Sequence, residues 1–400
     1  MTSGASGLRS GWPIHEEDEI AAVTAVLRSG RVNSLHHGEQ CQALEEGFAR
    51  LCDMPHAISV ANGTVALELA LRALGIGAGD EVIVPARSFF ASVSCVVAVG
   101  ARPVFADIEL TSGNISPEAV RDAVGPNTRA VLCVHLAGWS CEMDALRAIC
   151  DEHGLLLIED CAQAHGATYD GRAVGGFGDA AAFSFCTDKI ISTGGEGGLL
   201  LLRDGQAFER AWSFKDHGKD RARTFAPGGG SQFRWLHTSF GTNWRLTEMQ
   251  AAIGNAQLAK LPRWLEARRH NAAILDSALR DVPGVIVDAP GEHIGHARYK
   301  YYARIDTAVH RQAGARDAIA GAIAARGPFC GSGSCPEMYR EDAVRGSFFA
   351  PPSRLPNARE LGESSLMFQC DHTLSPEQMA DIGAIAADVI GNWERAQAAA

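Results

Sequence analysis

The stretch "SFCTDKIISTGGEGGLL", residues 184–200, places one lysine, Lys189, between an apolar run at 180–185 and a cluster of glycines at 194–198. A short apolar run predicts a buried strand. The glycines predict a turn in which the backbone approaches another group closely. A lysine in this position is typical either of a solvated turn or of a reactive amine at the end of a strand, and the surrounding chain has to decide between them.

Upstream of this stretch, short β-rich apolar runs alternate with helical periodicity. The runs are at 56–60, 81–85, 102–108, 129–136 and 155–160, and the helical patterns are at 63–75, 88–100, 116–124 and 142–154. Repeated β-α alternation predicts an α/β fold with a mostly parallel sheet and helices on both faces. Ligands of such sheets bind beyond the carboxyl ends of the strands.

Downstream, 181–185 and 197–203 predict two more strands, and 223–235, with three consecutive glycines, predicts a loop. Thr247 and Gln250 form a capping-box pattern that predicts the start of a helix. Pro262 is expected to bend this helix into a second segment that ends near Pro283. The rest of the chain suits a smaller α/β lobe. We therefore expect an N-terminal segment at 1–35, a large domain at 36–260 and a small C-terminal domain at 261–400.

Composition excludes several classes of function. The 400 residues carry 36 Lys+Arg and 47 Asp+Glu, for a net charge of -11, which opposes general binding to nucleic acid or to an anionic membrane. The eleven cysteines are odd in number and form no C-x-x-C pair, as expected for a reduced, cytoplasmic protein. We find no apolar run that would span a bilayer and no targeting segment.

The residues required to bind pyridoxal phosphate can each be sought separately. This cofactor needs a lysine for its aldehyde, backbone donors for its phosphate, a carboxylate for its pyridine nitrogen and a flat neighbour for its ring. The turn at Gly63 and Thr64 opens a helical run and offers free N–H groups, although it also reads as a simple N-cap. Phe89 begins the next helical pattern and is a candidate stacking residue or an ordinary core residue.

Asp160 ends the run "LLLIED", which reads as buried on both faces. A carboxylate in that place needs a partner, which makes it a functional candidate as well as a candidate turn cap. Gln163 and His165 follow it and are expected at the same edge of the sheet. No group of residues has metal-ligand spacing, so no metal is expected.

Taken together, these segments resemble the DegT/DnrJ/StrS-like sugar aminotransferases, a family of fold-type I enzymes that depend on pyridoxal phosphate. The resemblance covers nearly the whole chain. It rests on the blocks "GDEVIVP" (79–85), "ARPVFADIE" (101–109), "IEDCAQAHGATYDGRAVGGFGDAAAFSF" (158–185), "GGEGG" (194–198), "GTNWRLTEMQAAIG" (241–254) and "ARELGESSLMF" (358–368). It implies a seven-stranded, mostly parallel sheet and a smaller C-terminal α/β domain.

The resemblance also implies roles for single residues. Lys189 takes the place of the Schiff-base lysine, and Asp160 that of the acid that keeps the pyridine nitrogen protonated. The remaining implied cofactor contacts are Gly63, Thr64, Phe89, Gln163 and Ser184 within the chain and Asn243 or Arg245 reaching across a homodimer interface into the neighbouring site. Lysine rather than histidine at position 189 argues against the branch of the family that catalyses dehydration.

The implied reaction moves an amino group from an amino acid, for which we expect L-glutamate, to a keto sugar carried on a nucleotide. Pyridoxamine phosphate is the intermediate form of the cofactor. A 4-keto-6-deoxyhexose is the favoured acceptor, for an amino sugar of a polysaccharide or natural product. Two alternative acceptors are the 3-keto isomer and a ketocyclitol of the scyllo-inosose type, the latter with glutamine as a possible donor. A further alternative is a non-catalytic regulator that binds pyridoxal phosphate.

Two departures from the family pattern leave the substrate open. Cys186 stands on the substrate side, where many relatives have histidine or tyrosine, and His36 and His37 stand where aromatic residues are frequent. Lys219 and Arg31 lie in segments expected near the entrance and are candidate contacts to the nucleotide. The histidine pair and Lys219 are equally typical of solvated loops.

Overall fold

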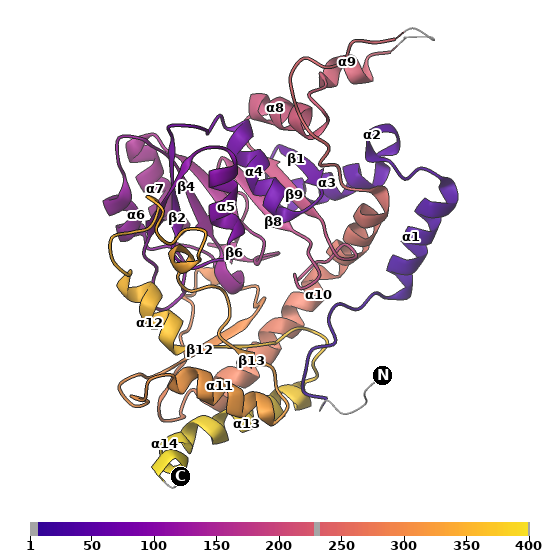
Figure 1. Ribbon diagram of the computed structural model, residues 1–400. Coiled ribbons are helices and arrows are strands. Elements are labelled where there is room, and N and C mark those ends of the chain that lie inside the picture. The colour runs from indigo at the N-terminus through magenta and orange to yellow at the C-terminus, as the bar shows by residue number, and fades with distance from the viewer. Residues whose placement is uncertain (1–6, 228–232, 399–400) are drawn as a thin grey trace.

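A large domain built around a central sheet lies above a smaller domain, as Figure 1 shows for the computed structural model. The structure describes residues 7–227 and 233–398. The three glycines of the expected loop at 223–235 lie outside the described residues, as do residues 1–6 of the expected N-terminal segment.

The large domain holds the predicted seven-stranded sheet, in the order β1-β9-β8-β5-β4-β2-β3. Its strands are β1 His56–Val60, β2 Glu81–Pro85, β3 Arg102–Ala106, β4 Thr128–Val134, β5 Leu156–Asp160, β8 Ala180–Ser184 and β9 Gly198–Leu202. All neighbours from β8 to β3 are parallel, and β9 runs antiparallel to both β1 and β8. The parallel strands end together, so their carboxyl ends form one edge of the sheet.

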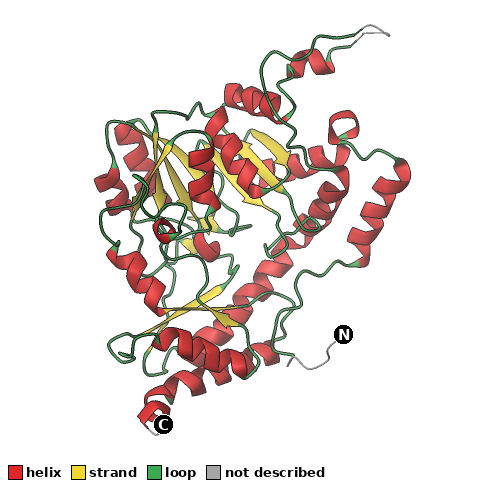
Figure 2. Cartoon of the chain, in the orientation of Figure 1, coloured by secondary structure: helices red, strands yellow, loops and turns green. Residues whose placement is uncertain are grey.

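Helices cover both faces of this sheet, as expected from the β-α alternation (Figure 2). α4 Gly63–Ala73, α5 Ala91–Ala98 and α8 Gly205–Lys215 share one apolar core with β1, β2 and β4. On the other face, α3 Glu39–Cys52 packs on β8 and β9, and α6 Pro117–Ala123 and α7 Met143–His153 pack on β2, β4 and β5. The strands are almost wholly apolar because both faces are buried.

One long helix, α10 Glu248–Leu279, connects the two domains. It begins at the predicted capping box of Thr247 and Gln250. The helix continues through Pro262 as one element and ends at Leu279, close to the predicted end near Pro283, and the predicted bend stays a prediction. Proline removes one backbone donor, but Leu261, Trp264 and Leu265 are buried on either side of it and hold the helix in place.

The small domain is an antiparallel sheet with the order β10-β12-β14-β13, packed on helices. Its strands are β10 Val285–Ile286, β12 Tyr301–Ile305, β13 Cys330–Gly331 and β14 Ser365–Phe368, and its main helices are α11 Ala315–Ala325 and α13 Pro376–Gly391. Their side chains and the end of α10 form a separate core. The boundaries expected at residues 35 and 260 stay a prediction.

The remaining elements lie around these two bodies. They are α1 Glu17–Ser29, α2 Ser34–His37, α9 Arg221–Phe225, α12 Pro356–Ser364, α14 Trp393–Ala398, the 3-10 turns at 136–138 and 338–340, and a small sheet of β6 Thr168–Tyr169, β7 Arg172–Ala173 and β11 Ile294–Gly295. Within residues 7–227 and 233–398, no helix is both long and apolar enough to cross a membrane.

Candidate active site

A cavity of about 500 Å3 opens at the carboxyl ends of the parallel strands. This is the edge at which doubly wound sheets bind their ligands. The structure brings together here eight of the residues that the sequence singled out: Gly63, Thr64, Phe89, Asp160, Gln163, Ser184, Cys186 and Lys189. They come from four separate segments of the chain, and the sheet places all four at one edge.

Lys189 follows β8, and its side chain is only 15% exposed. The Nζ atom lies 3.5 Å from Asp188 Oδ2 and 3.4 Å from the hydroxyl of Tyr299. Although burial opposes it, Lys189 together with Tyr299 keeps the pKa of Asp188 below its usual value. The lysine therefore lies in the cavity with an ionised carboxylate and a hydroxyl group in reach.

Asp160 is the last residue of β5 and is buried. Its Oδ2 accepts a hydrogen bond from Ser92 Oγ at 3.2 Å, and its Oδ1 accepts one from the backbone N–H of Ala162 at 3.1 Å. No ion pair to this carboxylate is formed within the described part of the chain. Burial consequently raises the pKa of Asp160. Such a group fits a ligand that brings a protonated nitrogen to it.

The N-terminus of α4 forms the opposite wall of the cavity. The side chain of Asn62 caps the helix by accepting the backbone N–H of Val65 at 3.0 Å. Residue 63 has to be glycine, because a Cβ atom at this position would lie 2.6 Å from Ser184 Cβ. The close approach places the Ser184 hydroxyl beside the free N–H groups of the first helical turn. Together they form a cradle for an anion such as phosphate.

Two further predicted residues complete the walls. The Gln163 side-chain oxygen accepts the backbone N–H of Ala137 at 2.8 Å, which leaves its NH2 group free to donate into the cavity. Phe89 is 67% exposed at the mouth. An aromatic ring that is this exposed and lines a cavity is available to stack on a flat ligand.

His165 does not line the cavity, contrary to the expectation from the sequence. It is buried among the rings of Phe48, Phe183 and Phe185. Burial lowers its pKa to about 3, so the ring is neutral. Gln163 therefore lines the cavity, whereas the His165 ring is packed in the apolar core.

Four other predicted residues lie outside the cavity of their own chain. His36 is exposed on α2, and Asn243 is exposed beside the buried Asp216. Arg245 and Lys219 both pair with Asp216 Oδ1, at 2.7 and 3.2 Å. These positions do not test the roles expected for these residues, which in the case of Asn243 and Arg245 require a second copy of the chain.

The sequence did not single out three residues that contact the central groups. Asp188 precedes Lys189 in the sequence, and this adjacency of opposite charges is the signal by which it could have been found. Tyr299 lies 110 residues further along the chain, and no local pattern links it to Lys189. Ser92 lies within a helical pattern, and its hydrogen bond to Asp160 becomes visible only once α5 is packed against the sheet.

The residues present fit pyridoxal phosphate on three structural grounds. A buried carboxylate forms no ion pair with any described residue, a glycine and a serine form a cradle that a Cβ atom would fill, and the cavity has a partly buried amine within it. These groups correspond to the needs of the pyridine nitrogen, the phosphate and the aldehyde. Lys189, Asp160, Gly63, Thr64 and Ser184 would hold the cofactor.

Comparison with known proteins agrees with this geometry. Residues 13–386 match the model of the DegT/DnrJ/EryC1/StrS aminotransferase family. The chain is 42% identical over 271 residues to "GDP-perosamine synthase" of Vibrio cholerae, covering 68% of this chain and 70% of that one. It is 39% identical over 277 residues to "L-glutamine:2-deoxy-scyllo-inosose aminotransferase" of Streptomyces kanamyceticus, covering 68% of this chain and 64% of that one.

A solved structure described as "the aminotransferase from Psychrobacter cryohalolentis" has the same fold. It superposes with a TM-score of 0.91 at 43% identity and covers 97% of this chain and 99% of that one. The similarity therefore extends through both domains and the cavity between the strand ends.

Proposed function

Because the chain belongs to the DegT/DnrJ/EryC1/StrS aminotransferase family, whose members depend on pyridoxal phosphate, we propose that it moves an amino group from L-glutamate to a nucleotide-linked keto sugar. The observation that carries the proposal is the placement of Lys189 and Asp160 in one cavity with the helix N-terminus at Gly63. The relative named GDP-perosamine synthase supports a nucleotide-linked substrate.

Each residue has a distinct task in this proposal. Pyridoxal phosphate, when bound, supplies the electron-withdrawing ring that makes amino transfer possible. Lys189 removes and returns a proton at the carbon that carries the amino group, and Asp188 and Tyr299 orient its amine from 3.5 and 3.4 Å. Asp160 holds a proton on the ring nitrogen, where burial makes the charge pair strong.

The other contacts position the ring. The N–H groups of Gly63 and Thr64 and the hydroxyl of Ser184 bind the phosphate, and the positive end of α4 favours its charge. Phe89 would stack on one face of the cofactor ring, and the NH2 group of Gln163 would donate to the hydroxyl group of that ring. Cys186 lies on the substrate side, where its thiol contacts Glu196 Oε1 at 3.7 Å.

The sites are expected to be shared between two copies of the chain. Asn243 and Arg245 lie outside their own cavity, and Arg245 is already held by the buried Asp216. Asn243 is exposed and uncharged, so its side chain is not tied to Asp216 by an ion pair, and it is proposed as the residue that reaches the phosphate of the neighbouring site. Lys219, also paired with Asp216, and the exposed His36 are proposed to line the entrance for the nucleotide.

Co-expressed chains test the shared site. Lys189→Ala and Asn243→Ala homodimers are each expected to be nearly inactive, whereas a hybrid purified through two different tags has one intact site. Because only one of the two equivalent sites is intact, the hybrid should show about half of the wild-type activity. A hybrid in which both chains carry Lys189→Ala is the control. An inactive hybrid, or an active monomer, would contradict the arrangement.

A half-reaction tests the substrate. The enzyme is first converted to its pyridoxamine phosphate form with glutamate, the donor is removed, and single ketones are added in turn. We expect the starting absorbance spectrum to return with a 4-keto-6-deoxyhexose linked to TDP, UDP or GDP. Glutamine in the first step distinguishes the two possible donors.

A ketocyclitol acceptor is the second candidate, because the relative from Streptomyces kanamyceticus is named for 2-deoxy-scyllo-inosose and glutamine. Return of the spectrum with scyllo-inosose, but with no nucleotide-linked keto sugar, would favour this candidate. In that event the aminotransferase chemistry stands and only the acceptor changes.

A further inference from the structure

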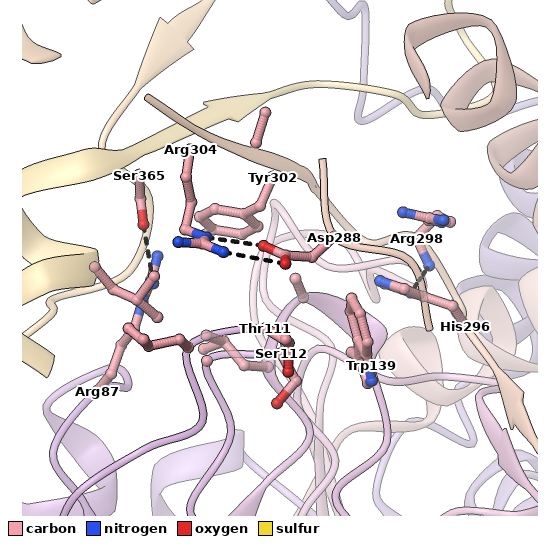
Figure 3. A pocket seen from close by; sticks show the side chains of 16 residues that line it. Arg87, Thr111, Ser112, Trp139, Asp288, His296, Arg298, Tyr302, Arg304 and Ser365 are labelled. Carbon is pink, nitrogen blue, oxygen red and sulfur yellow. Dashed lines mark hydrogen bonds and ion pairs between the residues drawn. The ribbon is translucent and has the colours of Figure 1, made fainter. Parts of the chain in front are cut away.

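A second, small cavity lies between the two domains, and it shares no lining residue with the cofactor cavity. Its volume is about 30 Å3. The large domain contributes Arg87, residues 110–113, Leu136, Ala137 and Trp139, and the small domain contributes Tyr302, Arg304 and Ser365 among others. Figure 3 shows Arg87 extending toward the strand that carries Ser365, with Arg304 and Tyr302 close to it.

Arg87 is the unusual member of this cavity. It is 3% exposed, and only its Nη1 donates a hydrogen bond, to Ser365 Oγ at 3.0 Å. The Nε and Nη2 groups have no partner among the described residues. The guanidinium carbon lies 4.9 Å from the centre of the Tyr302 ring, which stabilises the cation. A buried charge with two unused donors is costly unless a partner is supplied.

The acidic side chains nearby are already committed. Asp288 binds Arg304 through both of its oxygens, at 2.8 and 3.1 Å. The third arginine of the lining, Arg298, lies 3.7 Å from Asp276. His296 is buried, and burial lowers its pKa well below the usual value, so it adds no charge. Among the described residues that line this cavity, Arg87 is therefore the cation without a counter-charge.

We propose that this inter-domain cavity binds a single small anion, of which chloride is the natural example, beside the guanidinium group of Arg87. The volume admits one or two water-sized particles and excludes a sugar phosphate or a nucleotide. The anion supplies the missing counter-charge. Because Arg87 belongs to the large domain and Ser365 and Tyr302 to the small one, binding also stabilises the contact between the domains.

Bromide is a suitable probe because it scatters anomalously and is close to chloride in size. Crystals of the cofactor-loaded enzyme soaked in bromide should show an anomalous peak in this cavity, within hydrogen-bond distance of Arg87. In solution, replacing gluconate by bromide at constant ionic strength should raise the melting temperature by roughly 2 °C in a saturable manner. Gluconate is too large for the cavity.

Two variants make the test specific. Arg87→Met removes the donors at similar volume and should abolish both the peak and the saturable rise. Arg326→Met, which removes an exposed arginine paired with Asp388 at 2.6 Å, should keep both. Wild-type crystals without a bromide peak would refute the site, and so would an equal rise of the melting temperature in Arg87→Met. A peak without a saturable rise of the melting temperature would also refute it, because that result means binding at crystal concentration only. If Arg87→Met does not fold, the two wild-type measurements decide.

Discussion

Replacing Lys189 by alanine is expected to leave a folded protein that binds pyridoxal phosphate without a covalent bond and carries out neither half-reaction. The side chain is the amine of the cavity, and Asp188 and Tyr299 orient it. Both half-reactions need a proton moved at carbon, and removing the group that moves it should lower the rate by at least about a thousandfold. The measurement is the formation of 2-oxoglutarate from glutamate under single-turnover conditions.

Lys260→Met is the matched control for this variant. Lys260 lies on α10 and pairs with Glu16, Asp18 and Glu19, away from the cavity. Its loss should leave the rate unchanged. Substantial turnover in Lys189→Ala would show that another group carries the proton.

The Asp160→Asn variant is expected to keep its fold and to lose at least about a hundredfold in turnover. Asparagine has nearly the same size; its oxygen can still accept the backbone N–H of Ala162, and its NH2 group takes the place of Oδ2, where it can donate to Ser92 Oγ. It cannot hold a proton on the ring nitrogen, because a neutral amide provides no counter-charge. Turnover with saturating glutamate and keto acceptor is the measurement.

Asp170→Asn provides the comparison for that variant. Asp170 is exposed on a turn with a φ of 46°, a conformation that asparagine also adopts readily. This change should leave turnover near the wild-type rate. Normal turnover in Asp160→Asn would place the essential acid elsewhere.

Most of the large domain follows from local pattern. Apolar runs alternate with helical periodicity from β1 to β5, and the strands His56–Val60 to Leu156–Asp160 lie within one or two residues of the expected runs. Gly154 ends α7 with a φ of 65°, as expected of a helix C′ glycine. Burial on both faces explains why the strands were so easily recognised.

Features that depend on tertiary contacts were not predicted. Pro262 carries a local signal for a break, but the packing of Trp264 and its neighbours keeps α10 continuous. The contact between Lys189 and Tyr299 joins residues 110 positions apart, and the unpaired state of Arg87 depends on two domains meeting. Neither leaves a periodic or compositional trace in the sequence.

The sequence predicted which residues belong to the candidate site, and the fold explains why they lie together in one cavity. The positions of Gly63, Asp160 and Lys189 at one edge follow from parallel strands that end together. The sequence did not distinguish Asn243 from Arg245, and the role of either residue in a neighbouring site stays a prediction. Substrate recognition by Cys186, His36 and Lys219 stays a prediction.

The most direct test of the central claim is to reduce the cofactor-loaded enzyme with borohydride and to identify the modified peptide by mass spectrometry. The chain has only five lysines, Lys189, Lys215, Lys219, Lys260 and Lys300, so the outcome is unambiguous. Lys189 is the one that lines the cavity. We predict that the reduced cofactor is found on the peptide that contains Lys189. Modification of any of the other four lysines, or of none, would contradict the assignment of the active site.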